Sequence, residues 1–340
     1  MDVSWITFGS PIRRADGSIT SDLASLRYRV LSPIRELNRA PYSHQLTAIS
    51  EKTPDDLKEK ALRADVVVFS KSFLPANEAL AERARSRGVR VIFDVCDNHF
   101  QHPAFGPHYR RMAALADQVV CNTLEMAKVA RAYCAGEPVV IADPYEGPRG
   151  AAAFAPDGPL RLLWFGHPSN LDSLQEGLGD LIAYSASQPV ALTVLTHLTE
   201  AIDNGCRQVS GRHEGRFVMS AKPWSLEAQW RELAACDAVV IPSRDAPEKR
   251  VKSANRMIEA LWAGRPVVAQ PMPAYLALDH WAPTQPTLSE GCRWLLANRG
   301  SLPQLISEAQ RYIEEQHAPA VLAGQWAQVL ETQYARGAAV

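Results

Sequence analysis

Short apolar runs recur along this chain, and a segment long enough for a helix separates each run from the next. Examples are "VSWITF" at 3–8, "ADVVVFS" at 64–70 and "VRVIFDV" at 89–95, each bounded by turn-forming residues. Strands that alternate with helical segments build βαβ units, whose strands lie parallel in one sheet. The pattern therefore predicts an α/β fold.

The same pattern occurs twice, once in each half of the chain. Residues 143–159 lie between the halves, are rich in Pro, Gly and Ala, and have no apolar period, which indicates a linker. We therefore expect two Rossmann-like doubly wound domains at 1–145 and 146–305, and a C-terminal helix at 306–340 that crosses back to the first domain. The expected strands are 3–8, 44–49, 64–70, 89–95, 117–122, 138–143, 160–166, 190–196, 215–220, 236–242 and 265–270, and the expected helices are 25–37, 77–88, 123–136, 171–185, 225–235, 253–263 and about 302–336.

Composition excludes several classes of protein. The 36 basic and 37 acidic side chains leave a net charge of -1, so no basic surplus indicates a nucleic-acid partner. The six cysteines form no C-x-x-C pair, which argues against a disulfide framework or a zinc site and favours the cytoplasm. No apolar stretch reaches the length of a membrane-spanning helix. Peripheral membrane contact and the oligomeric state stay open.

The loop "SRDAPEKRVKS" at 243–253 follows one of the expected strands of the second half. Open α/β sheets bind ligands at the carboxyl ends of their strands, and this loop is locally cationic through Arg244, Lys249, Arg250 and Lys252. Ser253 is the expected N-cap of the next helix, and a helix start binds phosphate through its backbone N–H groups. The loop is therefore a candidate phosphate site.

Helical spacing places Lys252, Asn255, Arg256 and Glu259 on one face of that helix, away from its apolar stripe. A carboxylate one to two turns behind the helix start can accept hydrogen bonds from the vicinal diol of a nucleotide ribose. The alternative is a solvated face on which Lys252 and Arg256 pair with Glu259. The position at a strand's carboxyl end favours a nucleotide diphosphate.

The segment "PSRDAPEKRVKSANRMIEALWAGRPVVAQPMPAY" resembles the nucleotide-sugar segment of the retaining, family-4-type glycosyltransferases of GT-B fold. The resemblance implies that Glu259 binds the ribose, that Lys252, Asn255 and Arg256 line the diphosphate, and that the active site lies in a cleft between the two domains. One departure stands out. The family has a second glutamate eight residues before Glu259, where this chain has Val251, so Glu248 or Asp245 are candidates to replace it.

Two further segments are expected to contact the donor. In "LLWFGHPSNLDSL" a glycine turn follows a strand, and related enzymes place such a turn against the donor diphosphate; the candidates are Gly166, His167 and Asn170. The Arg and Lys that many relatives carry just downstream are missing, so the phosphate-neutralising role moves to Lys249 and Lys252. Trp224 follows another strand, and either stacks on the base or anchors the next helix.

In the first half, "VIFDVCDNHFQHP" at 91–103 crowds carboxylates and imidazoles at a strand end. Their spacing matches no known metal motif, and the chain has no D-x-D, so no metal and no cofactor are expected besides the nucleotide-diphosphate sugar as co-substrate. The resemblance makes His99 and Asp97 the catalytic candidates, whereas Asp94 is expected to form a structural hydrogen bond. The acceptor candidates, in the loop after the first strand and the helix that follows, are Gly9 and Arg27.

Together these features predict a glycosyltransferase that moves a sugar from a nucleotide-diphosphate sugar to an acceptor hydroxyl. The resemblance implies retention of configuration, no metal, and a place in glycan or glycoconjugate biosynthesis, with a glycan, lipid-linked or small-molecule acceptor. Two alternatives stay open: a GT-B scaffold that binds a nucleotide or partner without transfer, and a sugar-nucleotide epimerase on the same fold.

Overall fold

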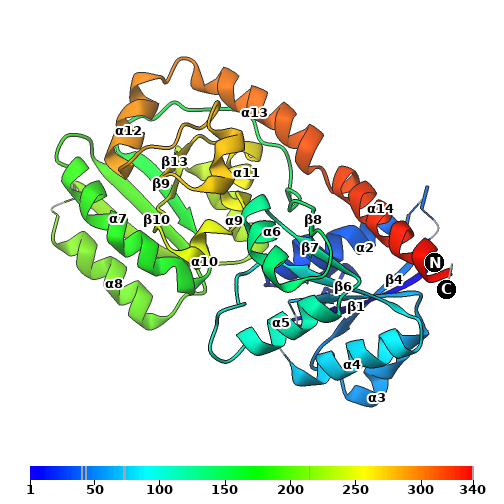
Figure 1. Ribbon diagram of the computed structural model, residues 1–340. Helices are drawn as coiled ribbons and strands as arrows, with labels where there is room; N and C mark the ends of the chain where they lie inside the picture. Colours follow the sequence, from blue (N-terminus) through cyan, green and yellow to red (C-terminus); the bar gives the residue numbers. More distant parts are fainter. Residues whose placement is uncertain (40, 43, 72–73, 214, 339–340) are drawn as a thin grey trace. The chain divides into compact units, whose positions relative to one another are not determined.

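The computed structural model describes residues 1–39, 41–42, 44–71, 74–213 and 215–338 (Figure 1). The chain forms two compact units, each with its own parallel sheet. The first unit comprises Met1–Pro144, Arg250–Ser253 and the residues from Gln316 onward, and the second comprises Tyr145–Lys249 and Ala254–Glu315. The expected α/β fold with two doubly wound domains is confirmed.

The sheet of the first unit has the strand order β4-β1-β5-β6-β7-β8, and all of its neighbouring strands are parallel. Side chains alternate across it: Val66 and Val68 face one core, and Val67 and Phe69 face the other. This alternation is the period of two that a strand imposes. The strands are β1 (Asp2–Thr7), β4 (Gln45–Ser50), β5 (Val66–Ser70), β6 (Arg90–Val95), β7 (Gln118–Cys121) and β8 (Val139–Val140).

Helices cover both faces of this sheet. In Figure 1, α2 and α14 lie over one face and α4 and α5 over the other. The helices are α1 (Ala24–Leu26), α2 (Ser32–Leu37), α3 (Asp55–Lys58), α4 (Pro75–Ser86), α5 (Gly106–Leu115), α6 (Leu124–Ala130) and α14 (Pro319–Ala338). A π-helical run, Arg27–Leu31, joins α1 to α2.

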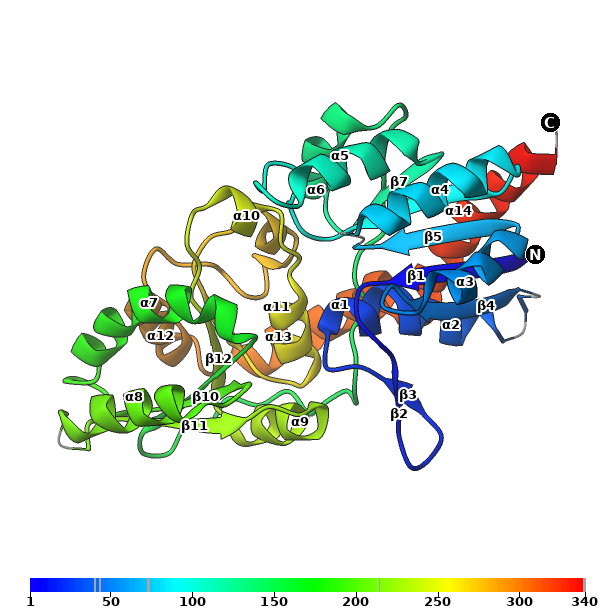
Figure 2. The same ribbon diagram turned by 90° about the horizontal axis from the view of Figure 1, so that it is seen from below.

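Part of the loop that follows β1 forms an antiparallel hairpin. Its two short strands are β2 (Ile12–Arg13) and β3 (Ile19–Thr20), and they extend from the first unit in Figure 2. The turn contains "ADGS", with Gly17 at a φ of 82°, a backbone conformation that glycine adopts without steric cost. Sequence patterns do not reveal these strands, because two residues are too few to show the alternation of side chains that marks a strand.

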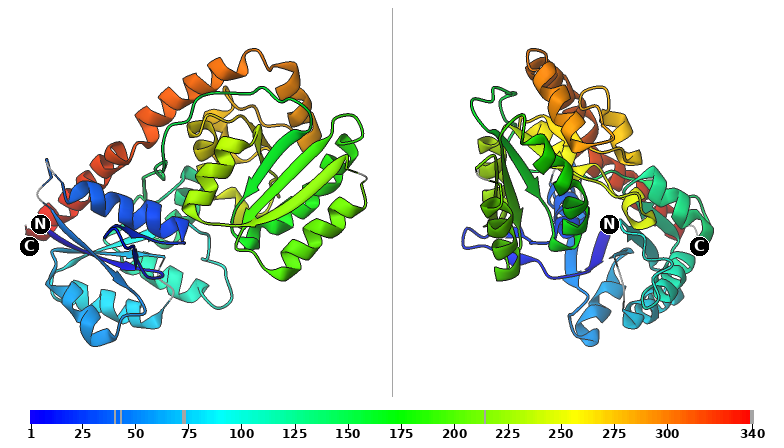
Figure 3. Two further views of the ribbon diagram at one scale, coloured as in Figure 1. Left: turned by 180° about the vertical axis from the view of Figure 1, so that it is seen from behind. Right: turned by 90° about the vertical axis from the view of Figure 1, so that its left-hand side faces the viewer.

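The sheet of the second unit has the strand order β11-β10-β9-β12-β13, again entirely parallel. Figure 3 shows α7 and α8 on one face of the sheet and α9 and α11 on the other. The strands are β9 (Leu160–Phe165), β10 (Val190–Thr196), β11 (Phe217–Pro223), β12 (Ala238–Ile241) and β13 (Val267–Ala269), and the helices are α7 (Leu171–Tyr184), α8 (Glu200–Gly211), α9 (Leu226–Ala235), α10 (Pro247–Arg250), α11 (Asn255–Trp262), α12 (Leu288–Ala297) and α13 (Leu302–His317).

The last helical stretch is divided in two. Ala318 separates α13 from α14, because Pro319 has no backbone N–H and disfavours helical geometry in the residue before it. Leu322, Trp326 and Leu330 of α14 are buried in the core of the first unit, where the ring of Trp326 meets that of Trp5 edge-on at 5.2 Å. The expected return of a C-terminal helix to the first domain is therefore confirmed.

The glycines of the expected linker allow close packing. A Cβ on Gly150 would lie 2.1 Å from the carbonyl oxygen of Ala263, and one on Gly147 would lie 2.1 Å from the ring of Trp230. The Gly147 carbonyl also accepts a hydrogen bond of 3.1 Å from Trp262 Nε1. The segment that begins at Tyr145 therefore packs onto the second unit instead of behaving as a free connection.

Residues 250–253 interrupt the second unit in sequence and belong to the first. Val251 is 2% exposed and packs in the core of the first unit, and its carbonyl accepts a hydrogen bond of 2.9 Å from Thr123 Oγ1. The residue that replaces the glutamate of the resembled family is therefore an apolar anchor. Its burial explains why an acidic side chain is absent at this position.

Candidate functional site

The carboxyl ends of the parallel strands in the second unit carry a row of aromatic rings. His167 follows β9, His197 follows β10 and Trp224 follows β11. The ring centroid of His197 lies 5.7 Å from that of His167 and 5.7 Å from that of Trp224. Because ligands of open α/β sheets bind at this edge, the row is a candidate surface for a planar group. The sequence reasoning missed His197, although it directly follows an expected strand.

The glycine turn after β9 is held in place by its neighbours. Thr196 Oγ1 donates to the carbonyl of Gly166 at 2.8 Å, and the His167 side chain accepts from the Ser169 backbone N–H at 3.2 Å. Asn170 Oδ1 accepts a hydrogen bond of 2.9 Å from the ammonium group of Lys249. The structure thus brings Gly166, His167, Asn170 and Lys249 together on this edge, as the sequence predicts for a phosphate site.

Arg256 lies beside the glycine turn. A Cβ on Gly166 would be 3.9 Å from Arg256 Nη1, and this nitrogen is buried without a hydrogen-bond partner among the described residues. A buried guanidinium nitrogen without a partner is costly, and an anion would satisfy it. This observation supports a ligand oxygen near Gly166.

Glu259 lies on α11, is 3% exposed, and accepts a hydrogen bond of 2.8 Å from Gln229 Nε2. Gln229 in turn accepts one of 2.9 Å from Trp224 Nε1. Glu259 thus has a neutral amide as a partner, and Lys252 pairs with Asp97. No local pattern connects Gln229 with Glu259, because Gln229 lies on a different helix, α9.

The start of α11 differs from the expectation. The helix begins at Asn255 with Ala254 as its N-cap, and no side chain caps it, so the prediction of Ser253 as N-cap is wrong. Ala254, with a φ of -81° and a ψ of 18°, takes the N-cap position one residue after the expected one. Asn255 keeps its expected place in the first turn.

The predicted cationic cluster is divided between the two units. Lys249 stays with Asn170 and Asp172 in the second unit, whereas Lys252 forms an ion pair with Asp97 in the first. The Arg244 side chain is 41% exposed and lies 3.4–3.5 Å from three carboxylates, those of Asp172, Glu176 and Glu248. Arg244, Lys249 and Lys252 thus each have a carboxylate partner, and their expected role at a diphosphate stays a prediction.

In the first unit, the carboxyl edge of the sheet holds an ion triad. Asp97 binds both the ammonium group of Lys71 and that of Lys252. Lys71 directly follows β5 and has a φ of 52°, a positive value that no other described non-glycine residue shows. Such strain persists only where surrounding contacts impose it, and it concentrates at functional sites. The sequence reasoning missed Lys71, although a lysine after the buried run "VVVFS" is a detectable signal.

The electrostatics assign different states to the two catalytic candidates. Burial alone would raise the pKa of Asp97, but the charges of Lys252 and Lys71 outweigh it and hold the pKa well below its usual range. Burial lowers the pKa of His99 to about 4, against the opposing charge of Asp97. Near pH 7, Asp97 is therefore a carboxylate with little tendency to take up a proton, and His99 is a neutral imidazole.

Asp94 is structural. It is fully buried, receives a hydrogen bond of 2.9 Å from Ser70 Oγ, and forms an ion pair of 2.6 Å with Arg29, which also lies 3.2 Å from Asp143. Its hydrogen-bond partners are the side chains of Ser70 and Arg29. Arg29 reaches these acids from the π-helical run, so it is a core residue.

The two acceptor candidates lie near the start of the chain. Gly9 has a φ of 87°, a backbone conformation that glycine adopts without steric cost, and a Cβ there would meet the end of the Leu23 side chain at 2.6 Å. Arg27 is 4% exposed and donates to the carbonyl of Ser21 at 2.8 Å. Its burial does not favour acceptor binding, and the roles of both residues stay predictions.

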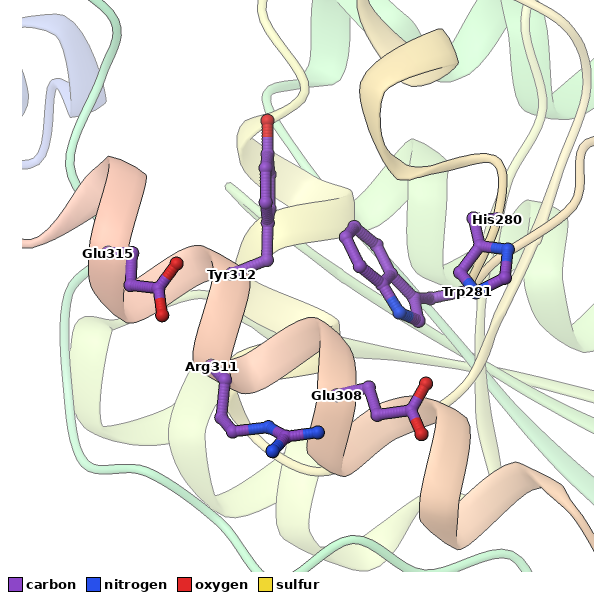
Figure 4. Close-up of a pocket in the computed structure, with 6 residues that line it drawn as sticks. All are labelled: His280, Trp281, Glu308, Arg311, Tyr312 and Glu315. Carbon is purple, nitrogen blue, oxygen red and sulfur yellow. The ribbon is translucent and has the colours of Figure 1, made fainter.

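A hollow of about 360 Å³ opens beside α13 (Figure 4). Its lining residues come after the predicted donor residues in the sequence. Figure 4 shows the rings of Trp281 and Tyr312 side by side, with centroids 4.9 Å apart. The other lining residues are His280, Glu308, Arg311 and Glu315. None of the predicted site residues lines this hollow.

Within the described residues, no three His, Cys, Asp or Glu side chains are grouped as they would be around a metal ion. In the same part of the chain, no helix has both the length and the apolarity needed to cross a bilayer.

Comparison with solved structures identifies the architecture. AviGT4, a glycosyltransferase involved in avilamycin A biosynthesis, matches with a TM-score of 0.58 at 16% identity over 100% of this chain and 98% of its own. The chain has the GT-B fold. A putative UDP-N-acetylglucosamine 2-epimerase from Listeria monocytogenes is a similar GT-B neighbour, with a TM-score of 0.61 at 12% identity over 98% of this chain and 97% of that one.

Two other GT-B neighbours are longer proteins. The pneumococcal O-GlcNAc transferase GtfA, solved with UDP and GlcNAc, has a TM-score of 0.59 at 12% identity, and TarM has one of 0.57 at 13%. The matches include 82% and 77% of this chain, but only 59% and 54% of GtfA and TarM, so the chain spans little more than half their length. No protein-family model and no curated protein matches the sequence.

Proposed function

We propose that this GT-B chain is a glycosyltransferase that moves a sugar from a nucleoside-diphosphate sugar to an acceptor hydroxyl. The observation that carries the proposal is Glu259, a buried carboxylate on α11 whose orientation Gln229 fixes. A carboxylate held in this way at the nucleotide-binding edge suits the two hydroxyls of a ribose. GtfA, one of the GT-B neighbours, was solved with UDP.

The diphosphate is expected to lie against the glycine turn and the start of α11. Lys249 and Arg256 supply positive charge there, and Arg256 Nη1 has no protein partner among the described residues. As the bond between sugar and diphosphate breaks, negative charge grows on the leaving phosphate, and preorganised cations stabilise it. In this proposal the two side chains and the helix start serve in place of a divalent cation.

In the first unit, His99 is the candidate that contacts the donor sugar or the acceptor. It is neutral near pH 7, so its ring can accept a proton or a hydrogen bond. Asp97 is a weak base because of its two ammonium partners, and we assign it the role of positioning Lys71 and Lys252. The proposal also includes retention of configuration and a cytoplasmic location, with or without peripheral membrane contact. Its acceptor is a glycan, a lipid-linked molecule or a small molecule.

The test is incubation with UDP-, GDP- and dTDP-sugars while nucleoside diphosphate release is measured. The proposal predicts release with one donor class, and faster release with an acceptor mixture that also gains the sugar. Binding of a nucleotide sugar without release of the nucleoside diphosphate and without an acceptor product would contradict the transferase proposal. It would favour a scaffold that binds the nucleotide sugar without transfer.

A sugar-nucleotide epimerase is the second candidate. Val251 leaves no carboxylate where the resembled transferases have one, and the putative epimerase neighbour matches nearly the whole chain. A hydrolysing epimerase consumes water and releases the nucleoside diphosphate together with a free sugar, whereas the transferase passes the sugar to an acceptor hydroxyl. A free sugar of inverted C2 configuration, identified by proton NMR, would favour the epimerase over the transferase.

A further inference from the structure

Gln229 joins two predicted donor-binding residues that lie on different elements. It lies on α9 and is 3% exposed. Its Oε1 accepts the indole N–H of Trp224 at 2.9 Å, and its Nε2 donates to Glu259 Oε2 at 2.8 Å. The amide thus connects the residue expected at the base with the residue expected at the ribose.

The chemistry of the two partners fixes the orientation of this amide. An indole N–H can only donate, and an ionised carboxylate can only accept. If the amide were turned over, its NH₂ would face the indole N–H and its oxygen would face the carboxylate, and both hydrogen bonds would be lost. Gln229 therefore has a single satisfied orientation, and it holds both partners in fixed positions.

We propose that Gln229 is a positioning residue that orients Glu259 for the ribose hydroxyls and presents Trp224 to the base by its ring face. This inference rests on the proposed function. Because the Trp224 N–H is bonded to Gln229, the indole meets the base by stacking. Every nucleobase has a π face, so this contact does not discriminate between uracil and guanine.

Burial makes the Gln229 bond important for Glu259. A carboxylate at 3% exposure has lost most of its hydration and depends on protein donors to remain charged. Loss of the Gln229 N–H would leave the carboxylate with one donor fewer and let it rotate away from the ribose. Nucleotide binding is then expected to weaken, although Gln229 itself does not touch the nucleotide.

The first test variant is Gln229→Glu, which keeps an acceptor for Trp224 but sets a second carboxylate against Glu259. Two carboxylates at hydrogen-bond distance cannot both ionise without strong repulsion, and they share a proton at lower pH. The dissociation constant of UDP or GDP is measured by calorimetry for the variant and for the wild type. At pH 8, the constant of the variant is expected to be about ten times that of the wild type. At pH 5.5 the shared proton restores a donor, so the ratio of the two constants is expected to fall below about three.

Two further variants complete the experiment. Gln229→Met has a similar length but forms neither bond, and it is expected to weaken binding equally at both pH values. Gln208→Glu on α8 is exposed and makes the same chemical change, so it is expected to bind as the wild type does.

The outcomes test the role of Gln229 and the proposed function separately. Wild-type affinity in both Gln229 variants would overturn the inference while the proposed function stands. A loss in Gln229→Glu that is the same at pH 8 and pH 5.5 would reduce Gln229 to a packing residue. If the wild-type protein binds no nucleoside diphosphate at all, the proposed function fails and the inference falls with it.

Discussion

The carboxylate of Asp97 binds the ammonium group of Lys252, which lies 155 residues further along the chain. Lys71 binds the same carboxylate, so one acid holds two cations at the edge of the sheet of the first unit.

The first prediction concerns the coupling between Asp97 and Lys252. In a double-mutant cycle with Asp97→Asn and Lys252→Ala, we expect a coupling energy of about 1 kcal/mol in unfolding by urea. The value is modest because the Lys252 side chain is 47% exposed and Lys71 remains as a partner. Additive single-variant effects would show that the pair contributes nothing to stability.

The second prediction tests the strain at Lys71. Lys71→Ala and Lys71→Gly both remove the ammonium group, but only glycine adopts a φ of 52° without steric cost. The glycine variant is therefore expected to be more stable than the alanine variant by about 1 kcal/mol. Urea midpoints of the two variants give the comparison, and an alanine variant at least as stable as the glycine variant would contradict it.

The third prediction concerns Val251. Restoring the acidic residue of the resembled family, by Val251→Glu, would bury an unpaired carboxylate in the core of the first unit. The expected loss of stability is about 3 kcal/mol or more, against about 2 kcal/mol or less for the cavity-forming control Val251→Ala. A glutamate variant as stable as the wild type would mean that this side chain has access to water.

The fourth prediction concerns Glu259. Glu259→Ala removes a charged hydrogen-bond acceptor and should weaken the binding of a nucleoside diphosphate by about 1.5–3 kcal/mol. Calorimetry measures the effect, with Asp203→Ala on α8 as control, because Asp203 pairs with Arg207 at the surface. Unchanged affinity in Glu259→Ala would remove this residue from the site.

The fifth prediction is a pH dependence that comes from His99. Its pKa is about 4 in the folded chain and close to 6.5 in an unfolded one, so the unfolded state binds more protons between these values. Stability should therefore fall as the pH is lowered from 6.5 to 4. The slope is expected to be shallower in His99→Asn, measured by urea unfolding at several pH values. Asp97, whose pKa is depressed, affects stability only below about pH 4, so it does not obscure this window.

Much of the fold could be predicted because it depends on local patterns. The buried runs at β5, β6 and β10 lie within one or two residues of their expected bounds, since a fully buried parallel strand has few polar residues to obscure it. The donor segment was also predictable in part. Gly166 directly follows β9, Lys249 lies in the segment between β12 and α11, and Glu259 lies about one turn after the start of α11.

The remainder depends on contacts between distant residues. The bond from Gln229 to Glu259 joins residues 30 apart, and no helical or strand spacing connects them. Charge alone grouped Lys252 with Lys249, but the burial of Val251 assigns the segment 250–253 to the other unit. Lys249 pairs with Asp172, whereas Lys252 pairs with Asp97.

The first unit is assembled from three stretches of chain, and α14 supplies Trp326 and Leu330 to its core. During synthesis, its sheet emerges from the ribosome before the helix that covers one face of it. The apolar surface around Trp5 then stays uncovered until the residues of α14 have been made. The second unit needs no residue beyond Glu315, so we expect it to reach its native packing first, although most of the first unit precedes it in the sequence.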